Sequence, residues 1–394
     1  MNSTFSIEPT TSVNAVTTAP PIATQAYYIE PNPSKIFRYV VYALLFLFAV
    51  VGNIAVCVVP IRQKRMRTFT YFLITNLAVS DIGTMLCLPP LLMFDYTSTW
   101  SIGETMCKLV NPSLTMFSLI TTNTLVAIAI DRFMSLVFPF VRRPQKKETI
   151  LVVTLTWLVA FACVLPSFGA RKLMPIMDEG HVFVYCVEEF PGDTVEDKIY
   201  HKKIYDIALY LINNTIPIII ISLVYVIIIF KLKGISLSKA FKRKSPKSSF
   251  EGYSQPALNS DEVYLKQKNE RERKFMQMLL SVVVVFVLFY VPVQTLFLLN
   301  TLLPSTSGWY YLYITYYYLY LMMWVPNALN PILYGAMNEQ YARAFKKILC
   351  CRWKSRKDGF GSTLGSYSRA PMTTKNTRND VAGSNTRETE MTLM

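Results

Sequence analysis

The sequence contains few charged residues for its length. Lys, Arg, Asp and Glu make up 16% of the 394 residues, and 52% of the residues are hydrophobic. About a quarter of a typical soluble protein is charged, so this chain could not cover a soluble surface of its size. The apolar residues must therefore face lipid or one another, which predicts an integral membrane protein.

The sequence is also poor in metal ligands and in features of secretion. It has two His and seven Cys, without any Cys-x-x-Cys pair, so we expect no zinc site. Residues 1–34 lack Lys, Arg and an apolar core, so we expect no cleavable signal peptide and expect the first span to direct insertion. The net charge of +15 comes from short basic blocks between uncharged runs. This pattern favours polybasic membrane flanks over a nucleic-acid partner.

Seven segments are long and apolar enough to cross a bilayer as helices. A helix needs about 20 apolar residues to cross the hydrocarbon core, and the cluster at 304–308 divides the last uncharged stretch into two spans. The sequence therefore predicts an all-α membrane protein with a seven-transmembrane bundle over 38–336. The expected spans are about 38–62, 69–95, 106–138, 148–169, 204–232, 271–303 and 308–336.

Three further segments flank this bundle. Residues 1–37 are rich in Thr and Pro and should form a disordered extracellular tail, whereas 352–394 should form a disordered cytoplasmic tail. Residues 337–351 should begin with an amphipathic helix on the inner membrane surface, because Tyr341, Phe345 and Leu349 follow one another at four-residue spacing.

The distribution of Lys and Arg predicts the orientation. Most basic residues lie in the connections on the same side as the C-terminal tail. By the positive-inside rule, that side is cytoplasmic and the N-terminus is outside. The sequon at Asn2 is then a glycosylation site, whereas the second sequon, at Asn213, lies at membrane depth and should stay unmodified. We expect a multi-pass protein of the plasma membrane.

Polar side chains at membrane depth point to function. Asp81, Asn53 and Asn330 fall within predicted spans, where such groups face the bundle interior. They form either a hydrated switch centre or simple hydrogen bonds between helices. Prolines in four spans act either as hinges or only as shape elements; these are Pro166, Pro217, Pro292 and Pro331.

The spans carry short motifs in a fixed order. They are Gly52-Asn53; Leu77-Ala-Val-Ser-Asp81; Cys107 with Asp131-Arg132-Phe133; Trp157; Pro217 with Tyr225; Phe286 with Tyr290-Val-Pro292; and Asn330-Pro331-Ile-Leu-Tyr334. Over about residues 38–350, this set resembles the rhodopsin-like (class A) G protein-coupled receptors. In character the chain is most similar to the neuropeptide receptors of that family.

The resemblance implies a coupling site for a heterotrimeric G protein at the cytoplasmic end. Arg132 would contact the G protein, and Asp131 would hold Arg132 in the inactive receptor. Glu272 either pairs with that arginine or is one charge of a solvated helix face. The full set implied for coupling and switching is Asp131, Arg132, Phe133, Pro139, Phe140, Tyr225, Glu272, Asn330, Pro331 and Tyr334. Arrestin and receptor kinases would act on the Ser- and Thr-rich tail, because phosphates add negative charge to it.

The resemblance also implies a transmission core within the bundle. Its members are Asn53, Asp81, Thr121, Pro217, Phe286, Tyr290, Pro292 and Asn327. The chain departs from the family at one of these positions and at the residue next to another. Tyr290 stands where the family has Trp, and Pro326 stands where the family has Asn, with Asn327 beside it. A sodium ion at Asp81 and Thr121 is therefore left open.

Cysteines carry two further implications of the resemblance. Cys107 and Cys186 would form the disulfide of the outer face, where oxidation is favoured. Cys350 and Cys351 would be palmitoylated after the amphipathic helix, which would anchor the chain to membrane lipid. The C-terminal Thr392-Leu-Met394 faintly resembles a PDZ ligand.

Several ligand classes are excluded by single residues. Trp324 replaces the lysine that would hold retinal, and Leu114 replaces the aspartate that would anchor an amine. Both histidines, His181 and His201, lie in or beside the second outer loop, so we expect no enzyme.

The second outer loop is rich in acids, and seven tyrosines lie between 310 and 320. These features favour a peptide that carries a positive charge. A lipid or another non-amine small molecule is the alternative for the ligand, and a seven-helix transporter is a remote alternative for the fold. The expected ligand-binding residues are Asp95, Leu114, Glu188, Glu189, Tyr290, Gln294, Tyr317, Tyr320 and Trp324.

Overall fold

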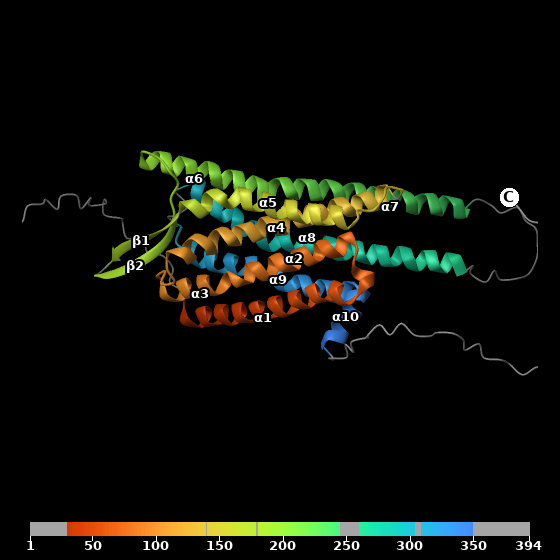
Figure 1. Ribbon diagram of the computed structural model, residues 1–394, viewed down its shortest axis with the longest axis horizontal. Coiled ribbons are helices and arrows are strands. Elements are labelled where there is room, and N and C mark those ends of the chain that lie inside the picture. Colours follow the sequence, from red (N-terminus) through yellow and green to blue (C-terminus); the bar gives the residue numbers. More distant parts are fainter. Residues whose placement is uncertain (1–29, 139, 179, 245–259, 304–308, 350–394) are drawn as a thin grey trace, which may run out of the picture. The chain divides into compact units, whose positions relative to one another are not determined.

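The computed structural model describes residues 30–138, 140–178, 180–244, 260–303 and 309–349, which form a bundle of long helices with one hairpin (Figure 1). In chain order the helices are α1 Asn32–Arg62, α2 Phe69–Leu86, α3 Leu88–Thr97, α4 Glu104–Val137, α5 Lys146–Ala170, α6 Val195–Tyr210, α7 Ile216–Lys244, α8 Ser260–Leu302, α9 Leu312–Met337 and α10 Glu339–Leu349. A short 3-10 helix, Lys64–Met66, connects α1 to α2.

Six helical segments of the described chain are long and apolar enough to cross a membrane. They are Asn32–Arg62, Phe69–Thr97, Glu104–Val137, Lys146–Ala170, Val195–Lys231 and Glu270–Leu302. Helix α9 is the seventh long helix of the bundle and packs against α1, α2 and α8. Its tyrosines, asparagines and prolines lower its mean hydropathy, which is why it falls outside that group although it occupies the same bundle.

Apolar side chains also cover the outside of the bundle. Leu47, Phe48 and Ile219 are each more than half exposed, although nothing in the described chain covers them. Large contiguous apolar surfaces of this kind are not stable in water, so these side chains face lipid. The composition and the exposed surface thus lead to the same membrane assignment.

Several helices extend beyond the apolar runs that predicted the spans. Helix α1 begins at Asn32, six residues before the expected start at 38. Helix α6 begins at Val195, where Thr194 accepts a hydrogen bond from the amide of Asp197 (3.1 Å) and caps the helix. Apolar residues set the width of the membrane segment, whereas capping and propensity set the helix ends. At these two starts the predicted spans are therefore shorter than the helices.

Prolines change the geometry of two spans. The second span divides at Cys87 into α2 and α3, because Pro89 and Pro90 cannot donate the backbone hydrogen bonds of a continuous helix. The fifth span contains a π-helical turn, Leu211–Thr215, directly before Pro217. This wider turn rotates α6 relative to α7 and determines which asparagines face the interior.

The hairpin defines one end of the bundle, called here the hairpin end. Strand β1, Arg171–Asp178, pairs antiparallel with β2, His181–Glu188, so that Arg171 lies opposite Glu188. Cys186 of β2 is bonded to Cys107 of α4, which confirms the predicted disulfide. Trp100 packs in the same buried cluster, so the hairpin is fixed to the start of α4.

The opposite end, called the α10 end, carries the short helix α10. Tyr341 and Ala344 are buried against α9 and α1, and Phe345 packs on the same core. Near this end α1 and α9 approach closely at Gly52, where an added Cβ would lie 2.8 Å from the ring of Pro331. Only glycine fits at that contact.

Candidate functional site

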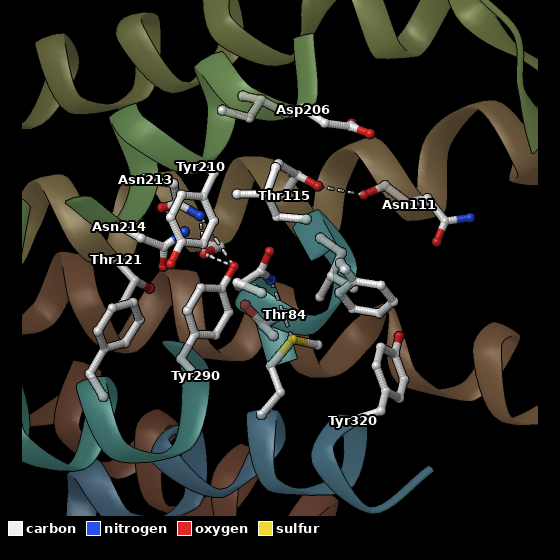
Figure 2. Close-up of a pocket in the computed structure, with 18 of the residues that line it drawn as sticks. Thr84, Asn111, Thr115, Thr121, Asp206, Tyr210, Asn213, Asn214, Tyr290 and Tyr320 are labelled. Carbon is white, nitrogen blue, oxygen red and sulfur yellow. Dashed lines mark hydrogen bonds between the residues drawn. The ribbon is translucent and has the colours of Figure 1, made fainter. Parts of the chain in front are cut away.

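A cavity of about 450 Å³ runs between the helices from the hairpin end towards the middle of the bundle (Figure 2). Its mouth includes Glu188 of β2 and Asp206 of α6, and its floor includes Asp81 of α2 and Asn330 of α9. Between them, Figure 2 shows Tyr290 of α8 facing Asn213. Of the expected ligand residues, the cavity is lined by Leu114, Glu188, Tyr290, Gln294 and Tyr320.

The charges at the mouth compensate one another. Glu188 lies 3.4 Å from Arg171 and 3.5 Å from Lys202, and it also accepts a hydrogen bond from Ser167. Lys202 contacts Asp206 at 2.8 Å. The two carboxylates and two cations give this group no net charge, so the mouth attracts a cation less strongly than its acids alone would suggest.

Glu189 lies outside the cavity, although it follows Glu188 in the chain. It forms ion pairs with Lys172 and, at 2.6 Å, with Lys198. These hydrogen bonds lower the pKa of Glu189 to about 2, so the side chain stays ionised at any physiological pH. The two neighbouring glutamates therefore differ, because only Glu188 faces the space that a ligand could fill.

A buried hydrogen-bond network crosses the middle of the cavity. Ser118 of α4 donates to the hydroxyl of Tyr290, and Asn213 donates to both, at 3.0 Å and 3.2 Å. Thr122 donates to the Asn213 carbonyl oxygen at 3.0 Å. The ring of Tyr290 stacks on Phe286 with centroids 4.8 Å apart. The network thus joins α4, the π-helical turn and α8 beside the cavity.

The floor is formed by polar groups from three helices. Asn330 donates to Asp81 at 2.9 Å, and Thr121 shares a hydrogen bond with Ser80 at 2.9 Å. The side-chain amide oxygen of Asn330, Oδ1, accepts no hydrogen bond within the described chain. Oxygen atoms of this kind suit a hard cation, and the question of a sodium ion at Asp81 and Thr121 stays open. Among the described residues, no cluster of three His, Cys, Asp or Glu could hold another metal ion.

Two transmission residues meet at the floor, where Asn327 of α9 lines the cavity and Asn53 packs behind it. Asn53 of α1 donates to the backbone oxygen of Asn327 at 2.8 Å and to its own helix at 2.9 Å. Asn53 is fully buried, so it ties α1 to α9 within the core.

Besides Glu189, three of the expected ligand residues lie away from the cavity. Trp324 is fully buried in the core. Asp95 and Tyr317 belong instead to an ionic cluster around Arg38, whose guanidinium lies 2.8 Å from Asp95 and 2.9 Å from Glu30. Arg38 also lies over the ring of Tyr317, 4.5 Å from its centre. The cluster joins α1, α3 and α9 at the hairpin end.

Sequence reasoning missed Arg38 and Glu30. The signal was present, because Arg38 is a cation within the start of an apolar segment, and such residues are usually paired. The side chain of Arg38 is only 2% exposed, so its pairing is buried within the bundle.

The α10 end carries a second cavity, of about 670 Å³, around Arg132. Arg132 pairs with Asp131, donates to Thr70 and lies over the ring of Phe275, 4.9 Å from its centre. Glu272 lines the same cavity but is exposed, and no ion pair joins it to Arg132 in the described chain. The cavity is basic, since its lining includes Arg65, Arg67, Arg143, Lys146, Arg271, Lys274 and Arg343.

The other predicted coupling residues have different surroundings. Tyr225 and Tyr334 are buried, and the ring of Phe133 contacts Phe138 at 5.8 Å. Phe140 is completely exposed. Pro139, Asn2, Cys350, Cys351 and the tail from 352 lie outside the described residues.

Comparison with known proteins agrees with this architecture. Residues 52–334 match the family described as "7 transmembrane receptor (rhodopsin family)". The chain is 30% identical to neuropeptide Y receptor type 2 of Sus scrofa over 350 residues, which cover 88% of this chain and 84% of the relative. The same receptor of Cavia porcellus is 30% identical, with 81% and 77% covered. Neuropeptide FF receptor 2 of Rattus norvegicus is 27% identical, with 81% and 74% covered. The chain therefore belongs to the rhodopsin family of seven-transmembrane receptors.

Proposed function

We propose that this chain is a cell-surface receptor that binds an extracellular peptide and activates a heterotrimeric G protein. The cavity of about 450 Å³ between the paired charges at the hairpin end and the polar floor carries this proposal. Its walls combine tyrosines, amides and apolar side chains, which suits one end of a peptide. The names of the similar receptors, for neuropeptide Y and neuropeptide FF, support a peptide ligand.

The hairpin end is then extracellular and the α10 end cytoplasmic. The disulfide between Cys107 and Cys186 supports this orientation, because such bonds persist on the oxidising side of a membrane. The basic cavity around Arg132 supports a cytoplasmic α10 end, in keeping with the positive-inside rule. With this orientation, Asn2 is available for glycosylation, and Cys350 and Cys351 are available for palmitoylation.

We also propose that the peptide carries a positive charge, which would have to compete with Lys202 for Glu188. Lys202 contacts Glu188 only at 3.5 Å but Asp206 at 2.8 Å. A ligand cation would take the place of Lys202 at Glu188, while Lys202 kept Asp206. The ligand would then bind by exchange of one cation for another rather than by attraction to an excess of acid.

Coupling would occur at the α10 end. Arg132 lies at the centre of the basic cavity, and Phe140 presents a fully exposed aromatic ring at the same end. An exposed aromatic side chain next to a charged cavity suits docking of a protein partner. Arrestin and receptor kinases would act on the tail, and α10 would lie on membrane lipid.

A direct test is to express the full chain in cells and apply neuropeptide Y and neuropeptide FF peptides. G protein activation by nucleotide exchange is the readout. The Arg132→Ala variant is the matched control, because it should still bind peptide without activating the G protein. If neither peptide nor any member of a wider peptide panel activates the wild type, while a neutral lipid does, the peptide proposal is wrong.

A further inference from the structure

Asn214 lines the cavity with an amide whose donor and acceptor both lack a hydrogen-bond partner in the described chain. The residue is 1% exposed, and neither its Nδ2 nor its Oδ1 atom forms a hydrogen bond within the described chain. Its neighbour Asn213 is also buried but uses its amide fully, on Ser118, Tyr290 and Thr122. A buried polar group without a partner costs about 1–3 kcal/mol. A protein rarely keeps such a group unless something fills the site.

The local fold explains why both asparagines face inward. They lie next to each other on the π-helical turn before Pro217, and both line the cavity (Figure 2). π-Helical turns of this kind are frequent at functional sites. The same cavity has apolar and aromatic walls from Leu125, Val282 and Phe286, which offer the Asn214 amide no hydrogen bond.

We propose that Asn214 recognises a primary carboxamide of the ligand. An asparagine amide presents one acceptor and a donor group in a plane, and a second primary amide matches both at once. An ammonium group would leave the Asn214 donor unpaired, and a carboxylate would leave its acceptor unpaired. This proposal rests on the proposed function only in assuming that ligands enter the cavity. The carboxamide could be the terminal amide of a peptide or the side chain of Asn or Gln.

The competing explanation is an ordered water. A cavity of about 450 Å³ has room for waters, and a water can satisfy both a donor and an acceptor. The two explanations predict different changes in stability when an apolar residue replaces the asparagine. An apolar side chain of similar size should stabilise a site kept for a ligand, but it should damage a site whose water holds the helices together.

The first measurement is the melting temperature of the purified, ligand-free full chain. We expect Asn214→Leu to raise it by about 2 °C or more, because the change removes an unsatisfied amide. Asn213→Leu is the matched control on the same turn. It should lower the melting temperature, because it leaves the partners on α4 and α8 without their bonds. If Asn214→Leu lowers the melting temperature as Asn213→Leu does, the proposal is overturned.

The second measurement uses three small probes and saturation-transfer NMR on the same proteins. N-acetylphenylalaninamide carries a terminal amide, N-acetylglutamine methyl ester carries a side-chain amide, and N-acetylphenylalanine methyl ester carries no primary amide. We expect at least one of the amides to bind the wild type and to lose at least about tenfold in affinity in Asn214→Leu. Which amide does so identifies the source of the group.

The ester should be insensitive to the substitution. Equal behaviour of the ester and the amides, or no binding of either amide to the wild type, would mean that the site holds water only and would overturn the proposal. Neither measurement uses a peptide agonist. A failed peptide screen would therefore count against the proposed function without affecting this result, and the reverse also holds.

Discussion

The ionic cluster around Arg38 should contribute strongly to stability. Arg38 is 2% exposed and Glu30 5% exposed, and Asp95 is 19% exposed. The substitution Arg38→Ala leaves the carboxylates of Glu30 and Asp95 without their cation in a largely buried environment. Breaking a buried ion pair from one side costs about 3–5 kcal/mol. Asp95 keeps the hydroxyl of Tyr39 at 2.6 Å, which favours the lower half of this range.

The predicted loss can be measured as a fall in melting temperature of the purified protein. About 3 kcal/mol corresponds to a fall of roughly 6–12 °C for a domain of this order of size. Arg38→Lys keeps the charge but loses the two-sided contact with Glu30 and Asp95 and the stacking on Tyr317. It should therefore fall between the wild type and Arg38→Ala.

A rescue experiment separates charge from packing. In an Arg38→Met background, Glu30→Gln and Asp95→Asn remove the carboxylates that lost their partner, so the melting temperature should recover by more than half. Met keeps much of the volume of the arginine stem. A melting temperature for Arg38→Ala within 2 °C of the wild type would refute the reasoning, as would a failure of the neutral pair to restore stability.

Three further predictions concern the two ends of the receptor. Glu188→Gln should weaken agonist potency in a dose–response assay at least about tenfold, roughly 1.4 kcal/mol. Glu189→Gln should leave the potency within threefold, because only Glu188 of the two lines the cavity. Equal effects of the two substitutions would contradict this prediction. Arg132→Ala should abolish nucleotide exchange on the G protein while peptide binding is retained, and full signalling by the variant would disprove its role. Truncation after Cys351 should abolish arrestin recruitment, measured by proximity luminescence; unchanged recruitment and internalisation would exclude the tail as the arrestin site.

Local features of the fold could be predicted from the sequence because each depends on a short pattern. The apolar runs located the helices, and the disulfide between Cys107 and Cys186 is present as predicted. The contact between Asp81 and Asn330 joins two polar residues that the sequence places at membrane depth. In each case the membrane restricts the positions that a charge, a thiol or an apolar run can occupy.

Pairing between distant charges could not be predicted in the same way. The acids of the second outer loop suggested a negative surface, yet Glu188 and Glu189 are matched by lysines of β1 and α6. Which lysine meets which acid depends on the register of the hairpin and on how α6 packs beside it, and no short stretch of sequence encodes this packing. The contact of Arg38 with Asp95 was missed for the same reason, because the two residues are 57 positions apart.

The departure at Tyr290 is best understood together with Asn213. A hydroxyl can donate and accept, whereas the indole that the family usually has there can only donate. Here the hydroxyl of Tyr290 accepts from both Ser118 and Asn213, so an indole at this position would leave their hydrogens without an acceptor. The π-helical turn is what brings Asn213 within reach of this hydroxyl and turns Asn214 into the cavity. The tyrosine on α8 and the widened turn before Pro217 thus act together, because each supplies one side of the polar network beside the cavity.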